Sequence, residues 1–405
     1  MPQLIPTDLE AARIINAAGT LTRLSGAVVS ERVAAAMAAA AQCSFDMWAL
    51  QAAASQRIAA ATGAEAGLVT TGAAAGLTLA AAAAIAGDDI ARMQALPRSE
   101  GLANEILVPR THRNGYDRAL AAAGARLIDI GTADRQTDAG VRGLEDWEVE
   151  TAITPATVAI LGNASAATEA DLPLLAAVAA RHRLPLIVDA AAQLPPQANL
   201  TAPLAAGATL VVFSGGKAIG GPQASGLLAG RRDLIRSAAL QMLDMDVPLR
   251  SFVPPAAFFG NHRPTALPRH GIGRGFKASK EAIVGLMVAL DDFLARDEAS
   301  AEADMRSRLE RLKDRIAGPA GISIELISGR RPGALPRLAI DFAPAAAVGA
   351  DDVCRALRRH SPPIHVGEGF VASGRLIIDL IATRPVDDEV LAVGLAAALT
   401  RVRNP

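Results

Sequence analysis

Short apolar runs alternate with longer amphipathic segments from the N-terminal part of the chain up to Pro255. The runs are rich in Val, Ile and Leu, as in LIVD and LVVF, which is typical of strands that a sheet buries on both faces. Between them, apolar residues recur at helical spacing, and this order predicts an α/β fold with a mostly parallel sheet covered by helices. The predicted strands are 105–109, 125–131, 157–163, 184–190, 208–215 and 225–230. The predicted helices are 29–42, 46–62, 73–86, 115–124, 171–182 and 200–206.

The pattern changes after Pro255. Residues 256–276 are rich in Gly, Pro, His and Arg and indicate an ordered loop, and long helices are predicted over 277–296 and 300–316. From residue 322 onward, strands such as ISIELIS and GRLIIDLI alternate with two helical segments, which indicates a smaller α+β C-terminal domain. We therefore expect an N-terminal segment, a large domain, and a linker helix with a small domain, over 1–50, 51–275 and 276–405.

One uncharged stretch, LVTTGAAAGLTLAAAAAIAG over 68–87, is about as long as a membrane span. Alanine is only weakly apolar, however, and Thr70-Thr71-Gly72 interrupts the run near its start. We interpret the stretch as the end of a strand, a tight turn and a buried alanine-rich helix, and we expect no membrane partner.

Composition and charge narrow the class of protein. The 405 residues are 51% hydrophobic but only 3% aromatic, so the apolar residues are mostly alanine and small aliphatics. The net charge is −1, and no basic stripe predicts a nucleic acid partner. Two cysteines, Cys43 and Cys354, form no disulfide framework, and the start of the chain lacks a signal-peptide pattern. We expect a cytoplasmic protein.

Residues suited to ligand binding or catalysis lie where predicted strands end, which is where open α/β sheets bind ligands. The first such place is the turn Thr71-Gly72-Ala73, which leads into the helix predicted over 73–86. Free backbone N–H groups and the helix dipole favour a phosphate there. Thr71 acting as an ordinary helix cap is an equal alternative.

Asp189 and Lys217 end two further strands. A carboxylate that closes an apolar strand needs a partner such as a pyridinium N–H, unless Asp189 merely caps a helix. An amine in apolar surroundings has a depressed pKa and can attack an aldehyde, unless Lys217 lies at the surface or binds a phosphate. A P-loop is excluded because Ala218 follows the lysine, and a partial dinucleotide pattern at 271–275 follows no strand.

A phosphate turn, a strand-end Asp and a strand-end Lys follow one another in the order that pyridoxal 5′-phosphate requires. Lys217 would hold the cofactor aldehyde, Asp189 would keep the ring nitrogen protonated, and the hydroxyl of Ser214 can bind the phosphate. The constellation predicts a pyridoxal phosphate enzyme, and no metal site is expected.

Three motifs resemble those of one enzyme family. VVFSGGKAIGGPQASGLLAG (211–230) is similar to the lysine motif of the selenocysteine synthase-like group of fold-type I pyridoxal phosphate enzymes. INAAGT (15–20) resembles the group's INATGT, and GRGFKASKEAIVGLMVAL (273–290) resembles its GRPMKVGKEEIVGLLAAL. The likeness extends in patches from about residue 13 to about residue 380, and SGGK-x-x-GGPQ is its most specific part.

The resemblance implies the fold-type I architecture and a homodimer or larger assembly with the cofactor near the subunit interface. It also implies that Lys217 is the Schiff-base lysine and Asp189 the partner of the ring nitrogen. By the same resemblance the phosphate site comprises Thr71, Gly72, Ala73 and Ser214.

His112, Asn163 and Ser165 follow two other predicted strands. We interpret His112 as the ring that stacks on the cofactor and as a possible acid or base, with a solvated loop histidine as the alternative. Asn163 and Ser165 could contact the cofactor's phenolic oxygen or the substrate, although turn chemistry alone would also place them there.

The chain departs from the family pattern in two ways. The tRNA-binding N-terminal domain of bacterial selenocysteine synthases is missing, so tRNA is not expected as a partner. The family's PPI-x-x-R and IDPRTL read PPIHVG (362–367) and IDLIAT (378–383) here, so two arginines suited to a substrate carboxylate are absent. Arg375, His365 or Arg274 could substitute, or each could be a surface charge.

We therefore expect an enzyme that abstracts the α-proton of an amino acid or amino sugar acid. By likeness to the group's ammonia-lyase, the expected outcome is α,β-elimination by a lyase, with Lys217 as the general base. A racemase or epimerase using His112 or His365, an aminotransferase, and a non-catalytic cofactor-binding protein are the alternatives.

Overall fold

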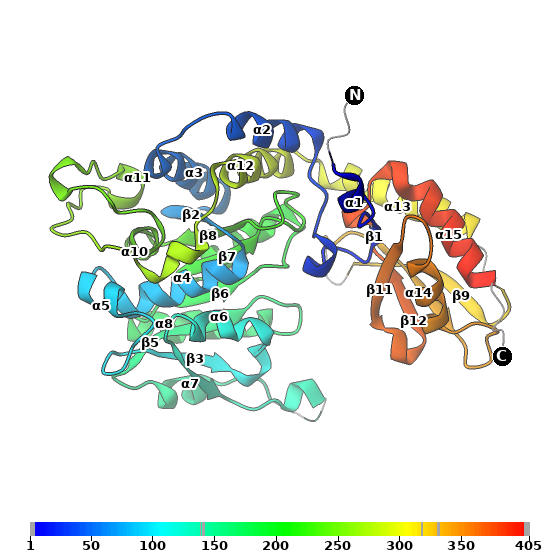
Figure 1. Cartoon of the computed structure of the whole chain (residues 1–405). Helices are drawn as coiled ribbons and strands as arrows, with labels where there is room; N and C mark the ends of the chain where they lie inside the picture. Colours follow the sequence, from blue (N-terminus) through cyan, green and yellow to red (C-terminus); the bar gives the residue numbers. More distant parts are fainter. Residues whose placement is uncertain (1–4, 138, 140–141, 317–318, 330–332, 401–405) are drawn as a thin grey trace. The chain divides into compact units, whose positions relative to one another are not determined.

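The computed structural model describes residues 5–137, 139, 142–316, 319–329 and 333–400. The chain forms two compact units (Figure 1). The large unit spans residues 29–294, and the small unit combines residues 1–28 with 295–405. These boundaries differ from the expected ones, because the first residues form a strand of the small unit and the expected linker helix packs into the large one.

A seven-stranded sheet forms the centre of the large unit, in the order β2-β8-β7-β6-β5-β3-β4. The five strands from β7 to β4 are parallel, and β8 runs antiparallel to both of its neighbours. The mostly parallel sheet expected from the apolar runs is therefore confirmed. The strands are β2 (Ala66–Thr70), β3 (Glu105–Pro109), β4 (Arg126–Ile130), β5 (Thr157–Asn163), β6 (Leu186–Asp189), β7 (Leu210–Ser214) and β8 (Gly226–Gly230).

Helices cover both faces of this sheet. α4 (Ala73–Ala86), α6 (Arg118–Ala121) and α10 (Arg232–Met242) share one hydrophobic core with one set of alternating strand residues. The opposite face contacts α3 (Met47–Thr62), α8 (Leu172–His182) and α12 (Lys280–Leu294). The glycines at 67, 162 and 215 show this, because a Cβ at each would meet a side chain of α3, α8 and α12, respectively. The remaining helices of this unit are α2 (Glu31–Ala41), α5 (Ile90–Ala95), α7 (Asp146–Ala152), α9 (Ala202–Ala205) and α11 (Ala256–Phe259).

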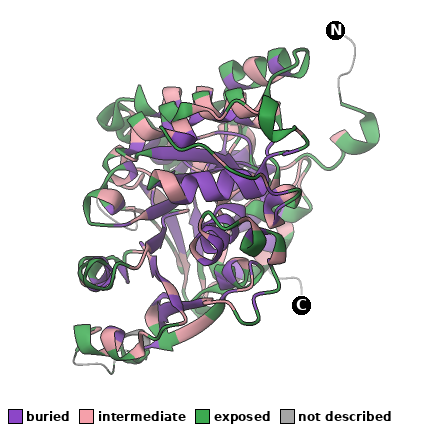
Figure 2. Ribbon diagram, turned by 90° about the vertical axis from the view of Figure 1, so that its left-hand side faces the viewer, coloured by how far each residue is buried: buried purple, intermediate pink, exposed green. Residues whose placement is uncertain are grey.

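The alanine-rich segment forms α4, a helix of 14 residues of which 11 are buried (Figure 2). Alanine favours the helix and has a short side chain, so α4 can lie close to both the sheet and α10. Thr78 donates from its hydroxyl to the carbonyl of Ala119, 2.8 Å away, which links α4 to α6. Among the described residues, no helix is both long and apolar enough to cross a membrane.

The small unit holds a five-stranded sheet in the order β1-β11-β12-β10-β9. β1 pairs with β11 in parallel, and the other pairs are antiparallel. Its strands are β1 (Ile15–Ala17), β9 (Ile322–Ile327), β10 (Arg337–Phe342), β11 (Ile364–Phe370) and β12 (Arg375–Ile378). Its helices are α1 (Thr7–Glu10), α13 (Glu298–Arg315), α14 (Ala350–Arg358) and α15 (Asp388–Thr400), and the last three share the core of the unit.

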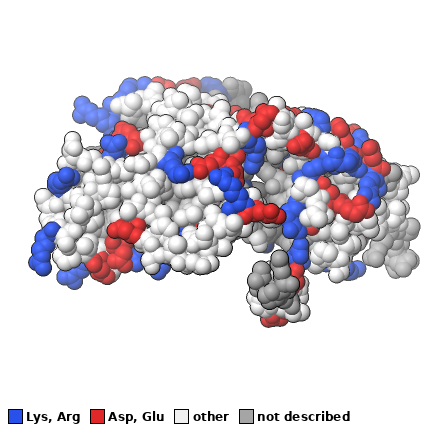
Figure 3. Space-filling model, turned by 90° about the horizontal axis from the view of Figure 1, so that it is seen from above, with Lys and Arg blue, Asp and Glu red and all other residues white. Residues whose placement is uncertain are grey.

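Charged side chains lie dispersed over the surface. On the face drawn in Figure 3, Lys and Arg lie beside Asp and Glu, and neither sign forms one continuous patch. Many of these charges form exposed ion pairs, such as Arg57 with Asp291. Such pairs contribute little to stability, so the cores carry most of the folding free energy.

Candidate active site

Three polar residues leave the large sheet on the face that α4 covers, at the carboxyl ends of their strands. Asn163 and Asp189 are direct neighbours in the register of β5 and β6, so their side chains point to the same side. Asp189 also pairs with Val212, and Ser214 lies two residues beyond Val212, which places Ser214 on that side as well. A Cβ on Gly76 of α4 would lie 3.0 Å from Val212, which identifies the face.

Lys217 follows β7 by three residues and is half-buried. Burial lowers the pKa of its amine below the usual 10.5, while the nearby charge of Asp189 opposes that shift. Within the described part of the chain the amine forms no hydrogen bond or ion pair. A lowered pKa and a nitrogen without hydrogen bonds are the two properties that a nucleophilic or basic amine needs.

The turn that carries Lys217 is tight because its glycines lie against the returning chain. A Cβ on Gly216 would lie 2.5 Å from the Cα of Gln223, so no larger residue fits without moving the backbone. Gly220 donates its N–H to the carbonyl of Lys217 at 2.9 Å, which closes the turn. The glycines therefore fix the direction of the lysine.

Asp189 is 8% exposed and accepts the N–H of Ala191 at 3.0 Å. Burial raises the pKa of this carboxyl above its usual range, and the negative charge of Asp117 raises it further, whereas Lys217 lowers it. No helix begins at Asp189, so the alternative in which it is a helix cap is wrong. A buried carboxylate of this kind gains from a cationic N–H partner.

The amino end of α4 lies next to these residues, because Thr70, Gly226 and Ser214 pair across β2, β8 and β7. The residue at the helix cap is Gly72, and no side chain caps the helix, so its first N–H groups have no side-chain partner. Thr71 instead donates its hydroxyl to the carbonyl of Phe276 at 3.2 Å. The alternative in which Thr71 caps the helix is therefore wrong.

His112 lies in a short 3₁₀ turn after β3 and is 2% exposed, so it is not a solvated loop residue. Its Nδ1 accepts the backbone N–H of Asn163 at 2.9 Å, which leaves the proton on Nε2. Nε2 then donates to Asp171 at 3.0 Å. Both nitrogens are engaged and the side chain is enclosed, so these contacts favour a role in positioning the end of β5.

Asp117 is a site residue that the sequence analysis missed. It is 7% exposed, its Oδ2 accepts hydrogen bonds from Arg113 and from the N–H of Asn114, and its Oδ1 is buried without a partner among the described residues. Because Asp117 belongs to the turn NGYD before α6, its sequence signal is that of ordinary turn chemistry.

The residues present fit pyridoxal phosphate. Among the described residues, the amine of Lys217 is free and the buried carboxylate of Asp189 has no cationic partner at ion-pairing distance. The amino end of α4 offers N–H groups that no side chain caps, which suits a phosphate. The hydroxyl of Ser214 is also free of hydrogen bonds within the described chain. Fold and site together define a fold-type I pyridoxal phosphate enzyme.

Comparisons with known proteins agree with this class. Residues 135–216, which include Asp189, match the DegT/DnrJ/EryC1/StrS aminotransferase family. The chain is 32% identical over 294 residues to D-glucosaminate-6-phosphate ammonia lyase of Salmonella typhimurium, which covers 71% of this chain and 69% of the relative. It therefore belongs to the D-glucosaminate-6-phosphate ammonia-lyase family, and the expected likeness to the selenocysteine synthase-like group is confirmed.

Two further comparisons cover nearly the whole chain. A 5′-C-glycyluridine monooxygenase-decarboxylase of a Streptomyces species is 29% identical over 384 residues, 93% of this chain and 87% of the relative. The solved structure of a D-glucosaminate-6-phosphate ammonia-lyase superimposes with a TM-score of 0.78 at 26% identity, covering 98% of this chain and 99% of that one. The family relationship supports a pyridoxal phosphate-dependent lyase.

The three residues that were alternatives for the missing arginines, or else surface charges, differ in their contacts. Arg375 is ion-paired with Asp341, and Arg274 is ion-paired with Asp244. The Nδ1 of His365 is buried and has no hydrogen-bond partner among the described residues. Of the three, His365 alone has a buried polar atom without a hydrogen-bond partner in the described structure.

Proposed function

We propose that this protein is a pyridoxal phosphate-dependent lyase that eliminates a β-substituent from an amino acid or amino sugar acid and releases ammonia. The observation that carries the proposal is the half-buried amine of Lys217, free of hydrogen bonds in the described chain, near the buried carboxylate of Asp189 at the carboxyl edge of the sheet. The family relationship to an ammonia lyase supports the same reaction.

The cofactor, when bound, supplies an electron sink for a carbanion at the substrate Cα. Asp189 would hold its ring nitrogen, and Thr71, Gly72, Ala73 and Ser214 border the place for its phosphate. Thr71 has its hydroxyl in a bond to Phe276, so the backbone of this turn is the better phosphate donor. Asn163 shares its face with Asp189 and has a free amide within the described chain, which suits a contact to cofactor or substrate.

Lys217 acts as the general base. Burial lowers the pKa of this amine, which favours its neutral form, so Nζ can take the proton from the substrate Cα. The substituent on Cβ leaves with the bonding electrons as the Cα–Cβ double bond forms. The resulting enamine tautomerises and is hydrolysed to a 2-oxo acid and ammonia.

His112 holds the end of β5 in place through the N–H of Asn163, with Asp171 fixing its tautomer. Its expected stacking on the cofactor stays a prediction. Assembly as a homodimer or larger and a place in the cytoplasm also belong to the proposal. The free thiols of Cys43 and Cys354 fit a reducing compartment, and light scattering of the purified protein tests the assembly.

The chain has four lysines, Lys217, Lys277, Lys280 and Lys313, which makes the first experiment direct. The protein is incubated with pyridoxal phosphate, its visible spectrum is recorded before and after borohydride, and the labelled peptide is identified by mass. We expect the label on Lys217, with none in Lys217→Ala and full labelling in Lys313→Ala. Colourless, unlabelled protein would refute the cofactor assignment.

Holoenzyme that has not been treated with borohydride is then offered D- and L-amino acids and amino sugar acids. Oxo acid and ammonia in equal amounts support elimination, whereas inversion of the α-centre without an oxo acid identifies a racemase. Transfer of the amino group to an added oxo acid identifies an aminotransferase, and a stable colour without turnover of any amine a non-catalytic binder. Because one relative is named a monooxygenase-decarboxylase, oxygen uptake and CO₂ are also measured, and their appearance would favour oxidative decarboxylation.

A further inference from the structure

Two charged residues act on the buried carboxylate of Asp189, and they lie on different sides of it in the chain. Lys217 follows β7, and Asp117 precedes α6. The elements packed directly against β6 add little charge, because α4, β5 and β7 contain no ionisable residue. The charged residues of α8 lie in its last turn, at the end that leads to the amino end of β6. A single charge in such surroundings is weakly screened, so Asp117 has a strong influence on Asp189.

Helix α4 holds Asp117 on the same face of the sheet as Asp189. Near its amino end, a glycine of α4 packs on Val212, which is the direct neighbour of Asp189 in β7. Further along α4, the hydroxyl of Thr78 donates to the carbonyl of Ala119 at 2.8 Å, which ties α6 to α4. Asp117 lies two residues before Ala119, so it is held beside the first turns of α4.

The loop that carries Asp117 is fixed at its other end as well. The Nδ1 of His112 accepts the N–H of Asn163, and Asn163 pairs with Asp189 in the sheet. Because Nδ1 accepts a hydrogen bond, the ring of His112 is neutral and adds no charge at this point. The loop therefore presents one charged group to the site from this side, the carboxylate of Asp117.

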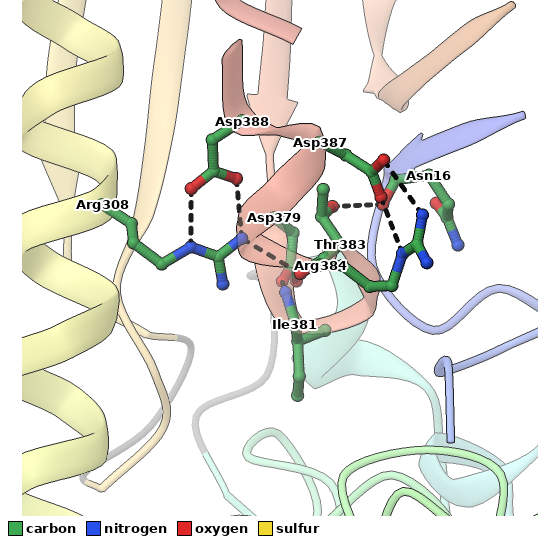
Figure 4. A network of polar contacts seen from close by, with 8 residues as sticks. All are labelled: Asn16, Arg308, Asp379, Ile381, Thr383, Arg384, Asp387 and Asp388. Atoms are coloured by element: carbon green, nitrogen blue, oxygen red, sulfur yellow. Dashed lines mark hydrogen bonds and ion pairs between the residues drawn. The ribbon is translucent and has the colours of Figure 1, made fainter. Parts of the chain in front are cut away.

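Asp117 belongs to a network in which one guanidinium serves two carboxylates. In the small unit, Arg308 and Arg384 each bind a single carboxylate (Figure 4). Arg113, by contrast, donates to both Asp117 and Asp129. The three side chains together therefore keep one net negative charge.

This net charge lies on the buried side of the network. The side chains of Arg113 and Asp129 are 37% and 38% exposed, whereas that of Asp117 is 9% exposed. The Oδ1 of Asp117 is buried and has no hydrogen-bond partner among the described residues, which costs free energy unless the charge has a use. Burial is the largest cause of the raised pKa of Asp189, and the charge of Asp117 adds to it.

We propose that Asp117 is a positioning residue that acts through Asp189, because its charge retains the proton that Asp189 shares with the ring nitrogen of the cofactor. The proposal rests on the function proposed above. A cofactor whose ring nitrogen stays protonated is a better electron sink for a carbanion at the substrate Cα. Asp117 needs no contact with the cofactor for this role, since its charge acts through the buried site.

The first test uses the cofactor-free protein, with ¹³C in the aspartate carboxyl groups and the Asp189 resonance identified by its loss in Asp189→Asn. The pKa of Asp189 should fall in Asp117→Asn, because a negative charge is lost, and rise in Arg113→Gln, because the offsetting positive charge is lost. A merely loosened loop would not give shifts of opposite sign. Asp117→Glu keeps the charge, and Asp129→Asn removes only the exposed carboxylate, so both should titrate like the parent protein.

Unchanged titration of Asp189 in Asp117→Asn and Arg113→Gln, or shifts of the same sign, would overturn the proposal. If Asp117→Asn does not fold, the direction of the shift in Arg113→Gln decides it. Neither result depends on the cofactor, so the proposed lyase function is not affected by them.

The second test loads the protein with pyridoxal phosphate that carries ¹⁵N in its ring and follows the ring nitrogen resonance against pH. The ring nitrogen should lose its proton at a lower pH in Asp117→Asn than in the parent protein and in Asp129→Asn. Identical titration in all three proteins would refute the role of Asp117 toward the cofactor. If no protein binds pyridoxal phosphate, the proposed function fails, and the titration of Asp189 still shows whether Asp117 acts on it.

Discussion

Replacing Gly226 by alanine tests whether the amino end of α4 is the phosphate site. Gly226 begins β8 and lies between Thr70 and Ser214 in the sheet. A Cβ at this position would lie 2.6 Å from the carbonyl carbon of Gly72 and 2.8 Å from the nitrogen of Ala73. Both contacts are with backbone, so the helix start must move away from the strand.

The size of the effect follows from what the clash displaces. Forcing one extra methyl into a packed region costs about 1 to 3 kcal/mol of unfolding free energy. The displaced N–H groups are those that would meet the phosphate, and losing one charge-assisted hydrogen bond costs about 1.5 to 3 kcal/mol. Cofactor affinity should therefore fall by roughly ten- to a hundredfold, at about 1.4 kcal/mol per factor of ten.

Urea unfolding of the cofactor-free protein and a spectral titration with pyridoxal phosphate measure the two effects separately. Gly275→Ala is the matched control, because a Cβ there would have no neighbour within 4 Å. If Gly226→Ala keeps both its stability and its cofactor affinity within the range of the control, the phosphate does not lie at this helix start.

Three further outcomes follow from the contacts. The rate of cofactor uptake, followed by stopped-flow absorbance, should rise with pH with a midpoint below 10.5, because burial lowers the pKa of Lys217. Asp189→Asn should move this midpoint lower still, since the charge of Asp189 opposes the lowering of that pKa. A midpoint that moves upward in this variant would contradict the interaction between the two residues. Asp171→Ala should cost about 2 kcal/mol in urea unfolding, because the Nε2–H of buried His112 loses its acceptor, and an unchanged midpoint would contradict that bond. Arg308→Ala should cost about 1 to 3 kcal/mol by the same measurement, because the side chain of Arg308 is 12% exposed and its guanidinium donates to the carboxylate of Asp388 and the carbonyl of Thr383. A loss near zero would show that the pair is only a surface contact.

Most strands of the large sheet could be predicted because burial on both faces makes them continuous apolar runs; the edge strand β4, with Arg126 and Asp129 exposed, is the exception. β3 and β5 have the predicted bounds. β1 was missed, because three residues are too few to show a period. β11, with the sequence IHVGEGF, carries two glycines and two polar residues, so its alternation is weak.

The site, like the fold, could be predicted only where the local sequence pattern is strong. Lys217 and Asp189 stand out because an ionisable residue ends an apolar strand, which is costly without a reason. Asp117 lies in the turn NGYD, which is rich in polar residues and where a charge is ordinary. Its importance comes from its effect on Asp189, which is distant in sequence, and no local pattern records such a relation.

The pairing of β1 with β11 has a consequence for how the chain is made. Residues 29–294 emerge from the ribosome and can fold before residue 364 exists, while the strand at residues 15–17 waits for its partner. Throughout that interval the apolar side chains of Ile15 and Ala17, buried in the finished unit, remain uncovered. During synthesis there should therefore be a stage in which the large unit is folded while β1, although made earlier, is still unpaired. That strand would be the part most in need of protection by a chaperone.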